Sequence, residues 1–405
     1  MFVPPWKWLN TFEVNVSVSI WNDRSSSTPK TADVVIIGGG IAGLSAAYWI
    51  GKEDPTMKVV VLEKYEIGAG ATGRNAGFVT CGSVEHFNRL VEKHGKEEAL
   101  EIWQFSEENM RLLKENIIKD SAKELLFEHK GSFSLASTDT EFKELQNSAA
   151  LMKSMNVKVE SIDEAGIKSR LGAEGFVGGI KYVEDGSVHP IKLLHKIKDC
   201  LSENVQVLEH HEVHAIENVG DGKRVLTNKG TLDCSIVVYA TNGYSPLLNK
   251  FFDDKIFPTR GQILATAPVP RFMEGPCYAN FVLDYFRQLP TGEMVIGGFR
   301  QLQKDVEKGY SDEASDVIQQ ALEKFLHDHI PSIRKAKITH RWSGIMGFSV
   351  DGQPMVGALP TDEQLFFVGG FTAHGLGLAF HSGKVLADGL FGRDIPKFIS
   401  ARRLR

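Results

Sequence analysis

The sequence predicts an α/β fold, and three observations point to it. An apolar run at 34–37 passes through a glycine-rich turn into a segment with helical periodicity, and a second apolar run follows at 59–62. Further strand-like runs continue as far as 368, and segments with helical periodicity lie between them. Alternating strands and helices of this kind are typical of a largely parallel sheet covered by helices.

The first elements predict a site for a dinucleotide. Gly38, Gly40 and Gly43 complete the pattern G-x-G-x-x-G. The first glycine permits a tight turn, the second lets the backbone approach a pyrophosphate, and the third lets helix and strand pack closely. Phosphate then lies on the free N–H groups of the helix. Glu63 ends the second run twenty residues after Gly43, where a carboxylate accepts hydrogen bonds from ribose hydroxyls.

Two details complete this first unit. The helix after the glycines is expected to close at Gly51, because glycine is the usual residue after a helix end. A second literal match to the glycine pattern, at 68–73, has no apolar strand before it and is interpreted as a chance match.

Composition narrows the class of protein. The 405 residues are 42% hydrophobic and 24% charged, as in an ordinary globular chain, and the net charge of −5 gives no electrostatic case for binding nucleic acid. The four cysteines have neither zinc nor C-x-x-C spacing, which favours a reducing compartment. The sequence has no apolar stretch long enough for a membrane span and no signal-peptide pattern, so we expect a cytoplasmic protein.

The later elements imply two interleaved domains. Helices are expected at 97–119 and around 317–325, the second ending before Pro331. Strands are expected at 205–208, 213–216, 236–240, 263–266, 294–297 and 365–368. We assign 31–82, 185–250 and 342–405 to a nucleotide-binding domain, 83–184 and 251–341 to an inserted domain, and 1–30 to an N-terminal arm.

Two more segments look like a strand that passes into a glycine-containing turn, and they favour a resident flavin over a nicotinamide. They are VVYATNGYS at 237–245 and FFVGGFTAHGLGLAF at 366–380. With them, the chain from about 33 to 390 resembles the D-amino-acid oxidase superfamily of FAD enzymes, which includes glycine oxidase, sarcosine oxidase and γ-glutamylputrescine oxidase. The motifs that carry the resemblance are GGGIAG, Glu63, GATGRNAG, DGSVHP, ATNGYS, WSGIMGFSVDGQPMVG and GGFTAHG. RNAG, PTRGQ and YFRQLPTGEMVIGG look most like the γ-glutamylputrescine oxidase group.

The resemblance implies a fold and a set of cofactor contacts. The fold is a discontinuous Rossmann-like FAD-binding domain with an inserted antiparallel-sheet substrate domain. The first glycines would line the pyrophosphate, Glu63 the ribose, Val213 the adenine, and the helix after His374 would direct its positive end at the flavin. The expected cofactor-binding residues are Gly38, Gly40, Ile41, Ala42, Gly43, Glu63, Lys64, Gly70, Ala71, Thr72, Arg74, Asn75, Ala76, Gly77, Phe78, Val213, Ala240, Thr241, Gly344, Gly370, His374, Gly375, Leu376 and Gly377.

The implied reaction is oxidation of a C–N bond by hydride transfer to the flavin, followed by hydrolysis of the imine. The protein mainly has to orient a small amine or amino acid and exclude water, and no metal is required. Gly344 stands where some sarcosine oxidases carry the cysteine that attaches FAD, so the FAD is predicted to be noncovalent. Val295 aligns approximately with a lysine that assists oxygen in that group, which leaves oxygen and another electron carrier both open as acceptors.

The substrate anchors of the resembled enzymes are missing. Met346 replaces the arginine that holds a carboxylate in glycine oxidases, and Gly377 replaces the lysine of sarcosine oxidase. Arg260, Arg287 or Arg300 could supply a guanidinium instead. We single out Arg287, together with His374 and Met346, as the candidate catalytic positions.

Two alternative functions stay open at this stage. One branch of the superfamily modifies tRNA, although the balanced charge of this chain speaks against that activity. The missing carboxylate anchors would also be compatible with a protein that binds flavin without catalysis.

Overall fold

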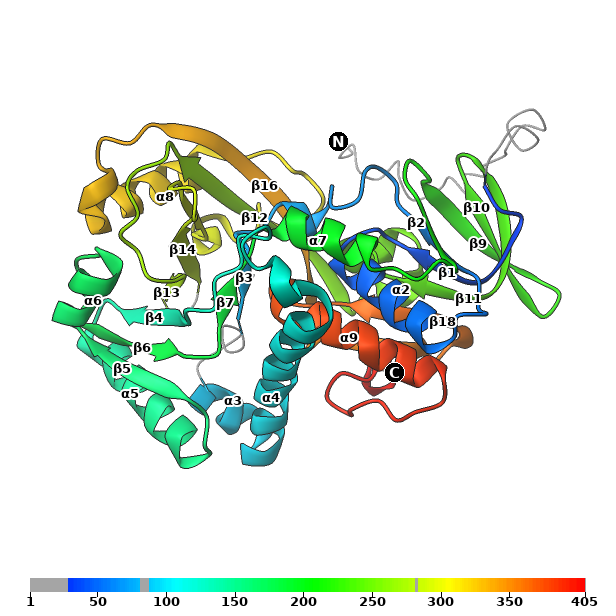
Figure 1. The fold of residues 1–405 in the computed structure, drawn as a ribbon, viewed down its shortest axis with the longest axis horizontal. Coiled ribbons are helices and arrows are strands. Elements are labelled where there is room, and N and C mark those ends of the chain that lie inside the picture. The colour runs from blue at the N-terminus through cyan, green and yellow to red at the C-terminus, as the bar shows by residue number, and fades with distance from the viewer. Residues whose placement is uncertain (1–27, 81–86, 281–282, 405) are drawn as a thin grey trace, which may run out of the picture.

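The computed structural model describes residues 28–80, 87–280 and 283–404. The predicted N-terminal arm therefore lies almost entirely outside the described residues, as does Cys81. Two eight-stranded sheets lie side by side along the long axis of the molecule (Figure 1). The α/β class predicted from the sequence is confirmed.

The first sheet is built around β1 and has the order β17-β18-β11-β1-β2-β8, with β10 paired to β11 and β9 paired to β10. Its strands are β1 (Thr31–Ile37), β2 (Val59–Leu62), β8 (Val205–Leu208), β9 (Val213–Val219), β10 (Gly222–Thr227), β11 (Gly230–Tyr239), β17 (Met355–Leu359) and β18 (Asp362–Gly369). β1 pairs in parallel with β2 and with β11, so chain segments far apart in the sequence form one sheet. Val34 to Ile37 are buried, as expected for a strand covered on both faces.

Four helices share a core with one face of this sheet: α2 (Ile41–Glu53), α4 (Lys96–Leu113), α7 (Pro190–Asp199) and α9 (Gly375–Leu390). α2 and α9 approach closely, since a Cβ built on Gly383 would lie 2.7 Å from the Ala46 nitrogen. The expectation that Gly51 closes α2 is wrong, because the helix continues to Glu53. Gly51 instead gives room to β8, since a Cβ there would lie 2.5 Å from Val205 Cγ2.

The second sheet has the order β16-β12-β15-β14-β13-β4-β6-β5. Its strands are β4 (Ser132–Ala136), β5 (Val159–Asp163), β6 (Gly178–Tyr182), β12 (Ile256–Thr266), β13 (Cys277–Ala279), β14 (Asp284–Gln288), β15 (Met294–Gly297) and β16 (Ile338–Ser349). The helices beside it are α3 (Phe87–His94), α5 (Asp139–Ser154), α6 (Glu164–Leu171) and α8 (Asp316–His329). All its pairings are antiparallel except β13 with β4.

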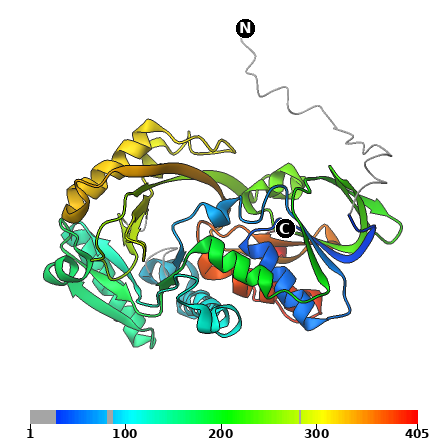
Figure 2. The ribbon, with the colours of Figure 1, turned by 45° about the horizontal axis from the view of Figure 1, so that its top comes forward.

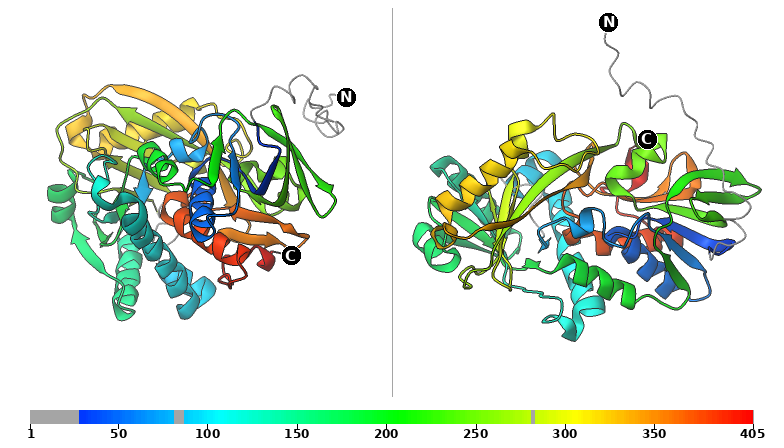
Figure 3. Two further views of the ribbon diagram at one scale, coloured as in Figure 1. Left: turned by 45° about the vertical axis from the view of Figure 1, so that its right-hand side comes forward. Right: turned by 90° about the horizontal axis from the view of Figure 1, so that it is seen from above.

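The second sheet uses its two faces differently. Leu264, Phe286 and Ile296 belong to one core with Leu322 of α8, and α8 (gold) covers the outer side of the sheet in Figure 2. The opposite face of β12, β14, β15 and β16 turns toward the first sheet, as the views in Figure 3 show. We call this opposite face the inner face.

A short two-stranded sheet of β3 (Phe78–Val79) and β7 (Gly186–Ser187) adds to these large sheets. The predicted domain limit at 342 falls inside β16. The division of the chain into domain segments stays a prediction. None of the described helices is long and apolar enough to cross a membrane.

Candidate active site

The turn between β1 and α2 is shaped by glycines that no larger residue could replace. Gly38 has φ +112°, and a Cβ on it would lie 2.7 Å from the Ala240 oxygen. A Cβ on Gly43 would overlap the carbonyl oxygen of Gly38. The predicted roles in tight turning and in close helix–strand packing therefore match the geometry.

The N-terminus of α2 is suited to an anion. Gly40 caps it without a side-chain hydrogen bond, and the first turn holds no acidic residue. The Ile41 N–H donates to Thr72 Oγ1 (3.0 Å), whereas the described residues supply no acceptor for the N–H groups of Ala42 and Gly43. These donors and the positive end of the helix dipole fit a pyrophosphate.

Glu63 lies directly beside this turn. Its carboxylate accepts hydrogen bonds from the Gly39 N–H (2.8 Å) and the Tyr65 N–H (2.9 Å). The Glu63 carbonyl accepts from the His211 N–H (2.7 Å), which brings the start of β9 at Val213 close to it. These bonds hold the acid where the sequence predicts ribose recognition and place the predicted adenine contact nearby.

Lys64, which is predicted to bind the cofactor, pairs its ammonium with Glu212, the residue before Val213. Its Nζ lies 2.7 Å from Glu212 Oε1, and both side chains are well exposed. The described residues include no group of three or more His, Cys, Asp or Glu arranged to hold a metal ion.

The segment 68–78 forms a second tight turn. A Cβ on Gly73 would overlap the Gly68 carbonyl oxygen, which repeats the close approach seen between Gly43 and Gly38. A short 3₁₀ turn, Ala71–Gly73, follows in place of a long helix. The glycine pattern at 68–73 is therefore a genuine turn, although no strand leads into it.

Arg74 and Asn75 fix the backbone that follows this turn. Arg74 donates from Nε to the Ala69 carbonyl (3.0 Å) and from Nη1 to the Ser343 carbonyl (2.9 Å). Asn75 Nδ2 donates to the Ala71 and Thr72 carbonyls, and Asn75 Oδ1 accepts from the Gly77 N–H (2.7 Å). Gly77 has φ +78°, and its Cβ would overlap the Val188 oxygen.

Gly344 also belongs to this contact. A Cβ on Gly344 would lie 2.8 Å from Arg74 Cβ, so the glycine makes room for the arginine. Trp342 Nε1 donates to the Arg74 carbonyl (3.0 Å). β16 is thereby held against the 74–78 segment through its inner face.

The turn before α9 meets the other end of β16. The Thr372 N–H donates to the Gly347 carbonyl (3.0 Å), and the Gly370 N–H donates to Asn242 Oδ1 (2.9 Å). Thr372 (φ +48°) and Ala373 (φ +75°) have left-handed backbone, a strained conformation that typically marks functional turns.

His374 caps α9, and burial lowers its pKa to about 4, so the imidazole is neutral at pH 7. Gly377 carries no side chain for a structural reason, because a Cβ there would overlap the Thr80 oxygen.

The inner face brings together residues from four strands. Pairing of Ile263 with Trp342 and of Ala265 with Val295 sets the register. Since side chains alternate along a strand, the inner-face residues can be read from this register. They are Trp342, Gly344, Met346 and Phe348 on β16, Ile263 and Ala265 on β12, Val295 and Gly297 on β15, and Tyr285 and Arg287 on β14.

This face is largely apolar. Ala76 and Phe78 share a hydrophobic cluster with Trp342, Tyr285 and Val295. The Phe78 ring packs edge-on against the Tyr285 ring at 5.8 Å. A Cβ on Gly261 would lie 2.8 Å from Met346 Cε, so the Met346 thioether covers that glycine on the same face.

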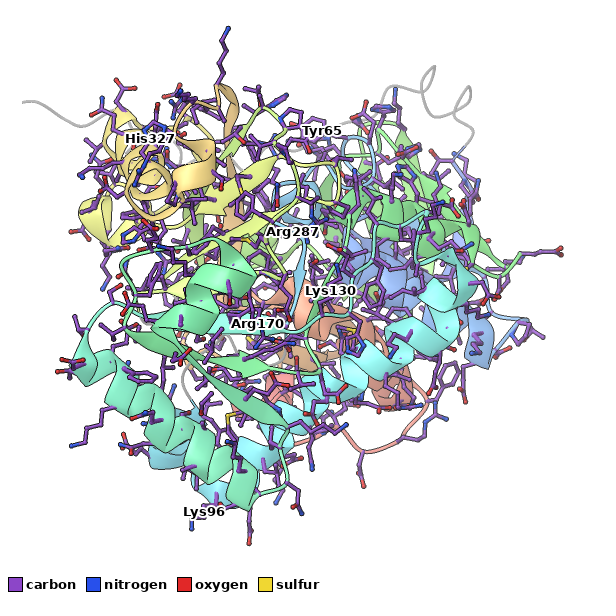
Figure 4. All side chains as sticks on the ribbon, turned by 60° about the vertical axis from the view of Figure 1, so that its left-hand side comes forward. Tyr65, Lys96, Lys130, Arg170, Arg287 and His327 are labelled. Atoms are coloured by element: carbon purple, nitrogen blue, oxygen red, sulfur yellow. The ribbon has the colours of Figure 1, made fainter. Side chains whose placement is uncertain are left out.

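Arg287 is the charged exception on this apolar wall. Its side chain is 2% exposed, and Figure 4 shows it in the interior of the molecule. Nη1 donates to the Gly77 carbonyl (2.8 Å), while Nε is buried without a partner in the described part of the chain. Burial lowers the pKa of Arg287 to about 10, and none of its neighbours within residues 28–80, 87–280 and 283–404 forms an ion pair with it.

Arg260, considered from the sequence as an alternative anchor, is already satisfied. Its register places it on the opposite face from Trp342, where Nε and Nη2 form a bidentate pair with the buried Glu307 at 2.9 and 2.6 Å. It is therefore not available to a substrate.

Three positions were not singled out from the sequence. Asn242 (φ +46°) connects the 237–245 segment to the turn before α9, and asparagine is one of the few residues that tolerate a left-handed backbone, which was a usable signal for it. Trp342 and Tyr285 begin two of the motifs quoted above, but only the register of the sheet places them together on the inner face.

The fit of a flavin dinucleotide rests on three observations of this arrangement. The α2 N-terminus presents free N–H groups beside glycines, and Glu63 is held next to them. Within the described chain, no atom lies within 4 Å of a Cβ built on Gly70, so the backbone there is open to a ligand. At the other end, Arg287 Nη1 donates to the Gly77 carbonyl, while Nε of the same guanidinium is buried without a partner in the described chain.

Comparisons with known proteins show which proteins this chain resembles. γ-Glutamylputrescine oxidoreductase of Escherichia coli is 25% identical over 383 residues, which is 91% of this chain and 85% of that protein. Glycine oxidase of Bacillus licheniformis is 24% identical over 376 residues, 90% of this chain and 95% of that protein. The crystal structure of glycine oxidase from Geobacillus kaustophilus matches the fold with a TM-score of 0.77 at 21% identity, covering 91% of this chain and 97% of that one.

The family comparison covers most of the chain. The sequence profile of the DAO family, described as FAD dependent oxidoreductase, matches residues 33–389. The chain therefore belongs to the DAO family of FAD-dependent oxidoreductases.

Proposed function

We propose that this protein uses FAD to oxidise the C–N bond of an amino acid or a close amino-acid derivative. The observation that carries the proposal is Arg287, a buried guanidinium without an ion-pair partner in the described chain, next to the segment expected to contact the flavin. The similar proteins named glycine oxidase and γ-glutamylputrescine oxidoreductase support an amine or amino acid as the substrate.

The chain's own residues supply binding and exclusion of water. FAD, when bound, accepts the hydride from the carbon next to nitrogen. The apolar inner face keeps water from the reacting carbon, with Trp342 and Tyr285 as its largest members. Because His374 is neutral at pH 7, it adds no cation that would repel an approaching amine.

Arg287 would bind the carboxylate of the substrate. Burial of a guanidinium without an ion-pair partner costs roughly several kcal/mol, and a carboxylate that pairs with it through two hydrogen bonds offsets that cost. Nη1 is used by the Gly77 carbonyl, so Nε and Nη2 are the donors that would face the ligand. Met346 would then form part of the apolar wall. Because Arg287 would hold the carboxylate, an arginine at position 346, where glycine oxidases carry one, would not be required.

Two further points extend the proposal. Position 295 is a buried valine and supplies no cation of its own, so oxygen and a separate carrier both stay open as acceptors, to be distinguished by reoxidation. We also propose a cytoplasmic location, supported by the buried free thiols of Cys234 and Cys277.

The test is anaerobic mixing of the FAD-loaded protein with a library of amines and amino acids. The proposal expects loss of the visible flavin absorption with at least one amino acid, and a much slower loss with the corresponding decarboxylated amine. Readmission of air then times reoxidation and identifies oxygen as acceptor if colour returns quickly. Equal rates with the amino acid and its decarboxylated amine would contradict the role of Arg287.

A further inference from the structure

A second arginine lies near the inner face with its charge uncompensated. Arg300 begins a 3₁₀ turn, Arg300–Gln303, directly after β15. Its guanidinium carbon lies 4.4 Å from the centre of the Phe348 ring, and Phe348 belongs to the inner face. The described residues form no ion pair with Arg300.

The charged groups around Arg300 do not neutralise it. Burial lowers its pKa, and the groups that act in the opposite direction are Tyr285 and Glu307. Glu307 is fully buried and already accepts hydrogen bonds from Arg260 and Gln262. Tyr285 is a neutral phenol at pH 7, because burial raises its pKa far above the usual range.

Arg287 is in register with Val295 and Tyr285 with Gly297, and Arg300 follows Gly297 in the chain, so along the sheet Tyr285 comes between the two arginines. Arg287 and Tyr285 are two residues apart on β14, which separates their side chains by about 7 Å along the strand. The Tyr285 ring covers Gly297, three residues before Arg300. A ligand on the inner face that reaches Arg287 with one end therefore extends past Tyr285 toward Arg300.

We propose that Arg300 binds a second anionic group, so that the substrate is an amino acid whose far end carries a second carboxylate. This proposal rests on the proposed function, because it assumes that Arg287 holds the first carboxylate. A ligand with a single carboxylate would leave one of two partly buried arginines unpaired. A ligand with two anionic ends pairs both, and Phe348 holds the second guanidinium in place through its ring face.

The test uses the FAD-loaded protein and non-reactive ligands. Straight-chain dicarboxylates from glutarate to suberate are titrated beside monocarboxylates of equal chain length, and the change in the flavin absorption spectrum gives each dissociation constant. We expect one dicarboxylate to bind about tenfold more tightly than its matched monocarboxylate. Arg300→Gln should abolish that preference and leave monocarboxylate binding unchanged, whereas Arg287→Gln should weaken both classes.

Several controls separate the outcomes. Lys304→Gln removes an exposed cation four residues away and should leave the preference intact. If Arg300→Gln fails to retain FAD, two other measurements test the proposal. The preference of the wild-type protein for a dicarboxylate over its matched monocarboxylate should shrink with added salt, and Arg300→Lys, which keeps the positive charge, should retain that preference. Equal binding of matched mono- and dicarboxylates, or a preference that survives Arg300→Gln, overturns the proposal. Failure of every amine to bleach the flavin, with dicarboxylate preference retained, would instead contradict the proposed function.

Discussion

Replacing Arg287 with methionine should stabilise the protein while weakening its binding of carboxylates. Burial of the guanidinium lowers the pKa of Arg287 from its ordinary value to about 10. Since the folded state disfavours the charged form, folding is weakened by about 3 kcal/mol at neutral pH, and the loss is relieved only above about pH 10. Methionine has similar length and carries no charge.

The net effect is smaller than this cost, because the substitution also removes a hydrogen bond. The charge-assisted bond from Nη1 to the Gly77 carbonyl contributes about 2 kcal/mol. The Gly77 oxygen retains the Val188 N–H at 2.8 Å, so it is not left unsatisfied. We therefore expect Arg287→Met to gain about 1 kcal/mol, which raises the thermal midpoint by about 2 °C.

The assay is thermal unfolding at a fixed scan rate with saturating FAD, together with titration of a monocarboxylate followed by the flavin spectrum. Carboxylate affinity should fall at least about tenfold. Arg341→Met is the matched control, because Arg341 lies in the same sheet and is exposed, with its Nη2 paired to Glu323; we expect a change within about 0.5 kcal/mol. A lowered midpoint in Arg287→Met with unchanged carboxylate binding would show that Arg287 is a structural residue.

Three further predictions concern the cofactor and pH. Gly43→Ala should prevent retention of FAD, measured by absorption after gel filtration, because the added Cβ overlaps the Gly38 oxygen; normal flavin content would refute the role of the turn. Glu63→Gln should weaken FAD binding about tenfold in equilibrium dialysis, because an amide has one acceptor oxygen where the carboxylate has two; unchanged affinity would exclude ribose recognition by Glu63. The folded state binds a proton at His374 more weakly than the unfolded state, so the stability of the wild-type protein should fall by up to about 3 kcal/mol as the pH drops from 6.5 to about 4. In thermal melts, His374→Gln should lose less stability over that pH range. Parallel pH profiles of the two proteins would contradict this prediction.

The elements of the first sheet were predictable because they depend on local pattern. The strands predicted at 59–62 and 205–208 coincide with β2 and β8. β2 is buried throughout, and a strand covered on both faces leaves an uninterrupted apolar run. The helix predicted at 97–119 instead ends at Leu113 and continues as a π-helical turn, Lys114–Ile118. The buried Ile117 and Ile118 keep the apolar periodicity through the change of helix type.

The candidate site was predictable only in part, for a physical reason. The glycine turns carry their own constraint, so Gly38, Gly43 and Gly77 stand out in the sequence. The inner face depends on the pairing of β12 with β16, and a strand's register cannot be read from the strand alone. That register separates Arg260, which is bound to Glu307, from Arg287, which is left without an ion pair in the described chain.

We expect the flavin ring beside Gly77 of the 74–78 segment, next to Arg287 of the inner face. The most direct measurement is a crystal structure of the FAD-loaded protein soaked with a non-reactive carboxylate. We predict the pyrophosphate at the α2 N-terminus, the ring beside Gly77 with the N-terminus of α9 facing it, and the carboxylate on Arg287. A ring bound elsewhere, or an inner face closed by its own side chains with FAD present, would contradict it.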